Sequence, residues 1–162
     1  MKHILIILTA FLLWGCYSFS GASIPPDVKA IYIGYFDNRA ELVNPTLSTE
    51  FTDALRTYIL SRASLKEVDE NPDVEITGDI VTYSIAPTAV TANAVAALNR
   101  LTIGVKVSYI SHRNEKDSFT KTFSHYQEFS SSMDISSVEA ELCTTISNQI
   151  IEDIFNEAFS NW

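Results

Sequence analysis

The feature that most constrains the fold is a change of hydrophobic periodicity along the chain. Apolar residues recur at helical spacing in residues 47–59, alternate with polar residues in the middle of the chain, and return to helical spacing in residues 135–159. Helical spacing predicts an amphipathic helix with one apolar face, and alternation predicts a strand with one apolar face. Such faces are buried by packing helices against a sheet.

The two helices are expected over residues 44–62 and 132–159. Asn44 is positioned to cap the first helix, with Pro45 in its first turn, and Ser132 or Asp134 is positioned to cap the second. The apolar stripes comprise Leu47, Phe51, Leu55, Tyr58 and Ile59 in the first helix and Ile135, Val138, Leu142, Ile146, Ile150 and Ile154 in the second. We expect both stripes to cover the same face of one sheet.

Strands are expected at residues 28–36, 74–82, 101–109 and 119–129, with a short one at 65–68. The first is rich in β-branched and aromatic residues, which is typical of a strand buried on both faces. The other three long strands alternate and are expected to form an antiparallel meander. The elements together predict an α+β fold: a two-layer sandwich with two helices on one face of a roughly four-stranded, mostly antiparallel sheet, in the order β-α-β-β-β-α.

The sheet is expected to contain a bulge, a long loop and one polar face. Gly78 inside a strand predicts the bulge. Residues 85–99, dominated by Ala and Thr around Pro87, predict a long hairpin loop. The face turned away from the helices is expected to meet water or a partner and carries Thr77, Lys106, Thr120 and Thr122.

Residues 1–16 have the pattern of a bacterial export signal. Lys2 gives a basic start, residues 4–14 form an apolar run, and Gly15 is the small residue that precedes a cleavage site. The run is too short to cross a bilayer, which takes roughly 20 apolar residues. Because Cys16 follows directly, the segment resembles a lipobox, in which the signal is removed before a cysteine that becomes lipidated. An ordinary signal peptide that happens to contain a cysteine is the alternative.

The lipobox interpretation divides the chain into three parts. Residues 1–15 are removed, residues 16–27 form a lipidated tether rich in Ser and Pro, and residues 28–162 form a single domain. Lipidation of Cys16 leaves Cys143 without a partner, and its apolar sequence neighbours predict a buried, inert thiol. A disulfide between the two cysteines is the alternative.

The charge of the chain limits its partners. The net charge is −9, and removal of Lys2 with the signal makes it −10. An acidic chain without a Lys/Arg-rich run is not expected to bind nucleic acid or to adsorb electrostatically to anionic lipid. Membrane attachment is therefore expected to depend on the acyl anchor, and several acyl chains are needed because one chain gives only marginal binding.

No catalytic or metal-binding motif is recognisable. The sequence lacks a GxSxG elbow, a P-loop, a GxGxxG loop and an HExxH helix. His112 and His125 have no further ligand at metal spacing, and Asp37, Glu41 and Glu50 are explained by proximity to a helix start. We therefore expect neither an enzyme nor a protein that holds a cofactor or metal.

Three polar positions beside the predicted elements are candidate contacts with a partner or an anionic ligand. Asn38 and Arg39 follow the first strand, Asn99 and Arg100 precede the third long strand, and Trp162 ends the chain. Arginine grips phosphate and carboxylate groups through a planar fork of donors. Turn chemistry or a solvated charge is the simpler explanation for each position.

Four segments carry a resemblance to a known family. They are Cys16 with the following YSFSGASIPP, the segment NRA (38–40) with VNPTLS (43–48), the segment NRLTI (99–103), and DIFN (153–156) with the final NW. Together they resemble the lipopolysaccharide-assembly lipoprotein family, LptE, over essentially the whole mature chain. The resemblance implies the same two-helix, four-strand sandwich.

The resemblance also implies a role in the last step of lipopolysaccharide export. Members of this family sit inside the large outer-membrane β-barrel LptD as a plug and assembly partner, and they can bind lipopolysaccharide. The family's basic lipid-binding positions have no matching motif in this sequence, so Arg39 and Arg100 are candidates from their chemistry alone. A mainly structural plug fits this acidic sequence better than strong direct binding of lipopolysaccharide. The segment after Cys16 lacks an inner-membrane-retaining Asp, which places the anchor in the inner leaflet of the outer membrane, facing the periplasm.

Two other classes of function remain open from the sequence. An accessory lipoprotein of a periplasm-spanning ABC-type lipid transporter would also be an anchored sandwich without catalytic residues. A hydrolytic enzyme would need a serine or carboxylate essential for turnover, and the sequence nominates none. Co-purification with a barrel or with a transporter separates the first two classes.

Overall fold

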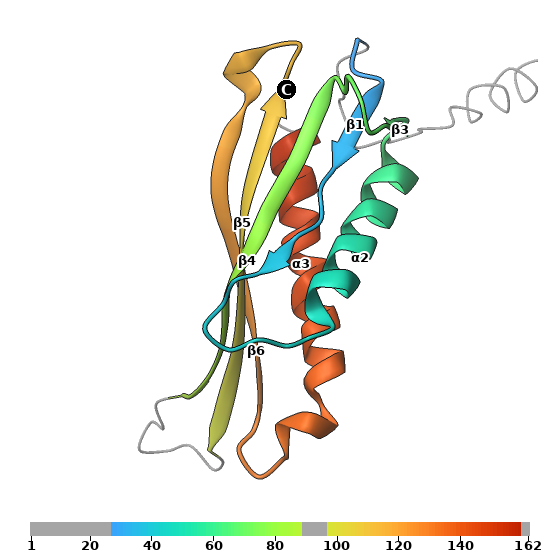
Figure 1. Ribbon diagram of the computed structural model, residues 1–162. Helices are drawn as coiled ribbons and strands as arrows, with labels where there is room; N and C mark the ends of the chain where they lie inside the picture. The colour runs from blue at the N-terminus through green and yellow to red at the C-terminus, as the bar shows by residue number, and fades with distance from the viewer. Residues whose placement is uncertain (1–26, 89–96, 160–162) are drawn as a thin grey trace, which may run out of the picture.

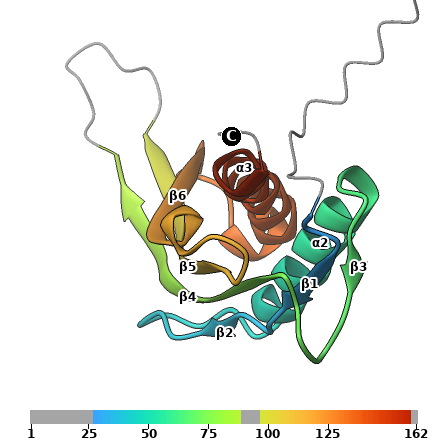
Figure 2. The same cartoon turned by 90° about the horizontal axis from the view of Figure 1, so that it is seen from above.

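The computed structural model describes residues 27–88 and 97–159, which form one sheet with two helices against one of its faces (Figures 1 and 2). The elements are β1 (Ala30–Ile33), β2 (Asp37–Asn38), α2 (Leu47–Arg62), β3 (Lys66–Glu67), β4 (Val74–Pro87), β5 (Leu98–Ser111), η1 (Glu115–Asp117), β6 (Phe119–Ser130), η2 (Ile135–Ser137) and α3 (Glu139–Phe159). The predicted α+β sandwich and its order β-α-β-β-β-α are confirmed. No helix within the described ranges is both long enough and apolar enough to span a bilayer.

The sheet is mixed, with strands in the order β3-β1-β4-β5-β6 and β2 also alongside β4. The long ladders β4–β5 and β5–β6 are antiparallel, as expected of the meander. The short strands β1, β2 and β3 pair in parallel with their neighbours. A parallel pair needs a crossover connection, and α2 supplies it between β1 and β4.

The hairpin joining β4 and β5 differs from the expected long loop over residues 85–99. The two strands continue to pair through Ile85 with Leu101 and Pro87 with Asn99, so their ends belong to the sheet. Alternation is absent there because the small side chains Ala and Thr give little periodic signal, yet any residue supplies backbone hydrogen bonds to a ladder. The part of the expected loop at residues 89–96 lies outside the described residues.

The expected bulge is also displaced along β4. The register of the β4–β5 ladder shifts between Ile80 and Thr82, not at Gly78. Glycine is required at position 78 for a different reason: a Cβ there would lie 2.2 Å from the carbonyl oxygen of Lys106 and 2.6 Å from the ring of Phe36. Close approach of a neighbouring strand and an aromatic ring, rather than a bulge, explains this glycine.

The core lies between the sheet and the helices. Buried residues of α2 and α3 repeat at the predicted helical spacing, and the apolar side of β4, β5 and β6 faces them. The two helices are joined by an edge-on contact between the rings of Tyr58 and Phe155, whose centroids are 5.4 Å apart. Burial of each large apolar side chain contributes about 1.5–3 kcal/mol to stability. The fully buried set includes Ile31, Phe36, Phe51, Leu55, Ile59, Ile76, Leu101, Ile103 and Phe159.

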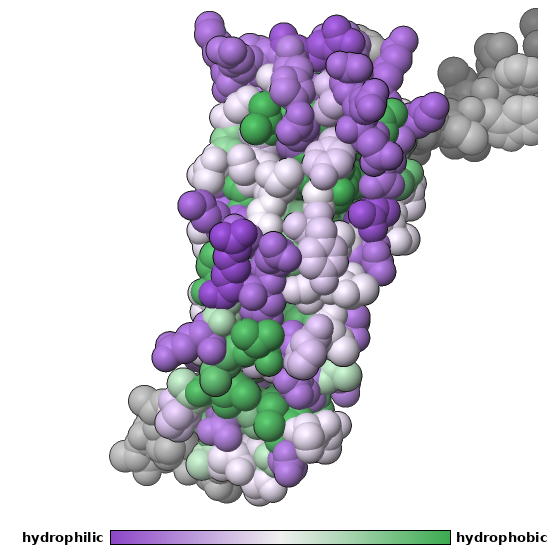
Figure 3. Space-filling model, in the orientation of Figure 1, coloured by the Kyte–Doolittle hydropathy of each residue, from purple (hydrophilic) through white to green (hydrophobic). Residues whose placement is uncertain are grey.

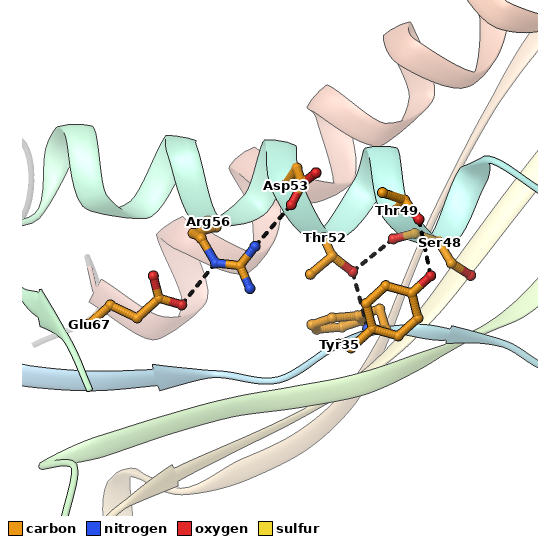
Figure 4. A network of polar contacts seen from close by, with 8 residues as sticks. Tyr35, Ser48, Thr49, Thr52, Asp53, Arg56 and Glu67 are labelled. Atoms are coloured by element: carbon orange, nitrogen blue, oxygen red, sulfur yellow. Dashed lines mark hydrogen bonds and ion pairs between the residues drawn. The ribbon is translucent and has the colours of Figure 1, made fainter. Parts of the chain in front are cut away.

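A row of polar contacts attaches α2 to the strands beneath it (Figure 4). The backbone N–H of Phe36 donates to Thr52 Oγ1 (3.1 Å), and that hydroxyl donates to the carbonyl of Ser48 (2.7 Å). Arg56 reaches Glu67 on β3 (2.8 Å) and Asp53 on its own helix (2.9 Å). The bond from Phe36 and the ion pair with Glu67 therefore join α2 to the segments beneath it.

The helix starts differ slightly from the predicted ones. Helix α2 begins at Leu47 after Thr46, yet Asn44 still caps it, because its Oδ1 accepts from the N–H groups of Thr46 (3.0 Å) and Leu47 (3.2 Å). Asp134 caps the short η2 turn, through Ser136 (2.9 Å), rather than α3 itself. An Asx turn and a 3₁₀ turn each place the cap before the regular helix.

Candidate interaction surface

The sheet face away from the helices is polar and uncovered within the described residues, as predicted. A shallow hollow on this face is lined by Tyr35, Asp37, Arg39, Thr77, Gly78, Asp79, Lys106, Ser108 and Thr120. Arg39 lies across it, with Nε 2.9 Å from Asp79 and a terminal nitrogen 3.8 Å from Asp37. Its side chain is 67% exposed, so Arg39 reaches solvent while held by carboxylates.

Arg100 lies on the same sheet face but near the other end of β5. Its guanidinium stacks 3.9 Å from the centre of the Tyr126 ring and bonds to Glu128 at 2.7 Å. The hydrogen bond to Glu128 raises the pKa of Arg100 above its ordinary value, so the side chain stays charged. Tyr126 is itself 51% exposed and leaves a broad aromatic surface beside the cation.

The structure does not bring the two arginines into one site. Asp79 pairs with Lys106 and Ala86 pairs with Arg100, so the sites of Arg39 and Arg100 stand six residues apart along β5. That separation corresponds to roughly 20 Å. Each guanidinium already has a carboxylate partner, so the two positions form separate neutralised pairs rather than a joint basic cradle.

The other candidate contacts have local roles or lie outside the described residues. Asn38 Oδ1 accepts from the N–H of Ala40 (3.1 Å) and its amide donates to the carbonyl of Asn44, which is turn chemistry. Asn99 is half-buried in β5 opposite Phe129. Cys16 and Trp162 fall outside the described residues, so lipidation at the first and contact at the second stay predictions.

A polar cluster that the sequence did not indicate joins three distant segments. The phenol of Tyr83 on β4 donates to Glu139 at the start of α3, and the amide of Asn44 donates to the same carboxylate oxygen (2.9 Å). Burial and the bond to Glu139 raise the pKa of Tyr83, so the phenol stays protonated and donates. Cys143, 2% exposed, lies beside this cluster, and burial raises the pKa of its thiol to about 11. The prediction that this thiol is buried is confirmed, and its lack of reactivity stays a prediction.

Exposed apolar side chains gather at the end of the molecule opposite the β5–β6 turn. In Figure 3 the hydrophobic surface lies low, over the connection from β2 to α2 and the end of β4, and the hydrophilic surface lies at the top. Leu42 and Val43 in that connection are 54% and 59% exposed, and Val81 and Ile85 on β4 are 38% and 37% exposed. A sequence signal existed for this patch: residues 80–99 contain no Asp, Glu, Lys, Arg or His.

The two histidines among the described residues are each paired with a carboxylate. Within the described residues, no group of His, Cys, Asp or Glu is arranged to hold a metal ion. His112 and His125 are each paired with a single carboxylate, Glu75 and Asp153, at 2.7 Å. The His125–Asp153 pair and the Lys121–Glu157 pair (2.8 Å) both connect β6 to α3. The pair of His112 with Glu75 lies in a surface pocket that Asp73 and Arg113 also line, and each of these pairs holds two segments of the fold together.

Comparison with known proteins identifies a family and a shared fold. The family model LptE, described as lipopolysaccharide-assembly, matches residues 28–158. Sequence comparison with curated proteins gives no match.

Solved structures with this fold come from several bacteria. A minor lipoprotein from Acinetobacter baumannii is 12% identical, with 80% of this chain and 91% of that chain covered and a TM-score of 0.52. A hypothetical protein from Chlamydia trachomatis is 10% identical over 81% of this chain and 98% of that one, with a TM-score of 0.53. An uncharacterized lipoprotein B from Nitrosomonas europaea is 13% identical over 82% and 81%, with a TM-score of 0.52. At such identities the likeness shows the fold alone.

Proposed function

Because the chain belongs to the LptE family of lipopolysaccharide-assembly proteins, we propose that it is a non-catalytic outer-membrane lipoprotein that plugs an LptD β-barrel, helps it to assemble and assists lipopolysaccharide transport to the outer leaflet. The observation that carries this proposal is the family match, which spans β1 to all but the last residue of α3. The mature chain is held to the inner leaflet by lipid on Cys16 and faces the periplasm. Residues 16–27 are the tether.

The surface of the domain is compatible with a position inside a barrel. The lumen of a large barrel is polar, and the uncovered sheet face of this domain presents hydroxyl groups and paired charges. The acidic chain and the carboxylate partners of Arg39 and Arg100 favour a structural plug over strong capture of lipopolysaccharide phosphates. In this role Asn38, Arg39, Asn99, Arg100 and Trp162 are proposed contacts with the barrel or with lipid.

Depletion of the chain from its own cells tests the transport role. We expect less lipopolysaccharide at the cell surface, measured by labelling intact cells, and less correctly assembled barrel in the outer membrane. A wild-type copy restores both, and a Cys16→Ala copy, folded but unanchored, restores them less well. Unchanged surface lipopolysaccharide after depletion would refute the proposed function.

A further inference from the structure

The edge of β4 beyond Ile80 has no strand beside it among the described residues. β1 pairs with β4 at Val74–Ile76 and β2 pairs with it at Asp79–Ile80. Farther along, β5 pairs with β4 on the other side as far as Pro87, and that is the only ladder there within the described ranges. Figures 1 and 2 show this end of β4 projecting beyond the connection from β2 to α2.

Within residues 27–88 and 97–159, the backbone along this edge presents donors and acceptors that have no hydrogen-bond partner. The N–H of Thr88 donates to the carbonyl of Leu98 (2.9 Å), so Thr88 faces β5. In an antiparallel ladder successive residues alternate in direction, so Tyr83, Ile85 and Pro87 turn their backbone groups away from β5. Pro87 fits this pattern, because a proline is tolerated where no ladder bond needs its nitrogen. Such a row of free groups is a template for another strand.

The side chains of this edge lack the charges that normally protect one. Residues 80–99 carry no charged side chain, and Ser84, Ile85, Ala86 and Pro87 are all exposed. The edge strand β6 at the other side of the sheet is different, since it carries Lys121, His125 and Glu128. Charged residues on an edge, lysine above all, prevent pairing with other chains. One edge of this sheet therefore carries charged side chains, whereas the other carries none and has Pro87 as its single edge-blocking residue within the described part of β4.

Apolar side chains flank the open edge. The N–H of Arg39 donates to the carbonyl of Ile80 (2.8 Å), and Asn44 shares Glu139 with Tyr83. The connection between Arg39 and Asn44 is thus held against β4, and it carries the exposed Leu42 and Val43. A strand that pairs with the edge would find apolar contacts for its own side chains here.

The chemistry of the edge identifies its occupant. Lipid offers no partner for free N–H and C=O groups, and each such group costs several kcal/mol in hydrocarbon. A second copy is disfavoured because two chains, each of net charge −9, would repel one another. An extended segment of a different polypeptide satisfies both the backbone groups and the uncharged side chains.

We infer that residues 83–87 of β4 are a β-strand docking site, to which a different polypeptide adds an extended, uncharged segment as an extra strand of the sheet. The contacts are backbone hydrogen bonds to Tyr83 and Ile85 and to the carbonyl of Pro87, which has no N–H, with Leu42 and Val43 packing against the added side chains. The inference holds whether that polypeptide is the export barrel or another chain.

Photo-crosslinking of the full chain in its own cells tests the inference. A photoreactive residue replaces the exposed Ser84, and in a control it replaces the exposed Thr122 on β6. Ile85→Pro removes the outward N–H at the centre of the edge, and the matched variant Ile85→Ala removes the same apolar side chain but keeps the N–H. We expect one polypeptide crosslinked from Ser84 and not from Thr122, with a yield about tenfold lower in Ile85→Pro than in Ile85→Ala.

The outcomes separate this inference from the proposed function. A crosslink to the export barrel with this pattern supports both, and the same pattern with another protein supports the docking site while opposing the proposed function. Crosslinks to lipid or to a second copy only, an equal yield from Thr122, equal yields in the two Ile85 variants, or no product would overturn the inference. If Ile85→Pro does not fold, as judged by its thermal midpoint, Ile85→Lys decides, because lysine on an edge blocks strand addition.

Discussion

At the scale of single residues, one carboxylate holds the start of the sheet. Asp73, 8% exposed, accepts hydrogen bonds from the backbone N–H groups of Lys29 (2.8 Å) and Ala30 (2.9 Å), and Arg113 Nε donates to its other oxygen (2.8 Å). The bond from Lys29, followed by those from Ala30 and Arg113, holds the pKa of Asp73 below its ordinary value. This side chain therefore anchors β1 to β4 more strongly when it is ionised than when it is protonated.

Replacement of Asp73 by asparagine is expected to lower the free energy of unfolding by about 2 kcal/mol at pH 7, because asparagine offers one acceptor oxygen in place of two charged ones. The measurement is urea denaturation of the mature chain with Cys16→Ala. Because the folded-state pKa is lowered, this contribution is complete above about pH 4 and disappears as the pH falls through the folded value. The exposed Asp69→Asn serves as control. A difference from wild type that persists unchanged into acid would contradict this account.

Replacement of Tyr83 by phenylalanine is expected to lower the free energy of unfolding by about 1.5 kcal/mol. The hydroxyl links β4 to Glu139, and without it the carboxylate keeps Asn44 as its one partner from another segment of the described chain. Tyr126→Phe is the matched control, since that ring is 51% exposed. Equal urea midpoints for the two variants would show that the cluster does not hold α3 to the sheet.

At the scale of elements, the helices and the long strands were predictable because each has a regular apolar period. The two-residue strand β2 could not be predicted. Asp and Asn are residue types typical of a turn, and Asp37 and Asn38 pair with β4 through their backbone. The end of β4 was missed for a related reason: Ala86 and Pro87 carry no alternating signal. The Tyr83–Glu139 contact joins residues 56 positions apart in the sequence. It depends on tertiary packing, so no local sequence pattern predicts it.

Strand β4 passes so close to the ring of Phe36 that a side chain at position 78 is expected to destabilise the fold. Gly78→Ala is expected to lower the free energy of unfolding by about 2–3 kcal/mol, because the added methyl meets the Lys106 carbonyl and the Phe36 ring. Gly34→Ala is the matched control and should cost less, since its nearest contact is the Thr77 methyl at 3.0 Å. Urea denaturation of both variants measures the difference. A larger loss in Gly34→Ala would contradict the proposed reason for Gly78.

At the scale of the whole molecule, the two ends of the sandwich differ in character. The end formed by the β5–β6 turn carries His112, Arg113, Glu115, Lys116 and Asp117, whereas residues 81–87 of β4, at the opposite end, carry no charge. The candidate contacts Arg39 and Arg100 could be found from sequence, but their pairing with carboxylates could not, since both partners come from other strands. The fold was therefore more predictable than the surface that meets a partner.

The most direct test of the central claim is recovery of the mature lipoprotein from detergent-solubilised outer membrane through an affinity tag. The account predicts a stable complex with one large LptD-type β-barrel, detected by mass spectrometry in near-equal amount. A tagged Cys16→Ala chain, which should remain folded but leave the membrane fraction, is the control for anchoring. Recovery of the lipoprotein alone, or with a transporter in place of a barrel, would contradict the account.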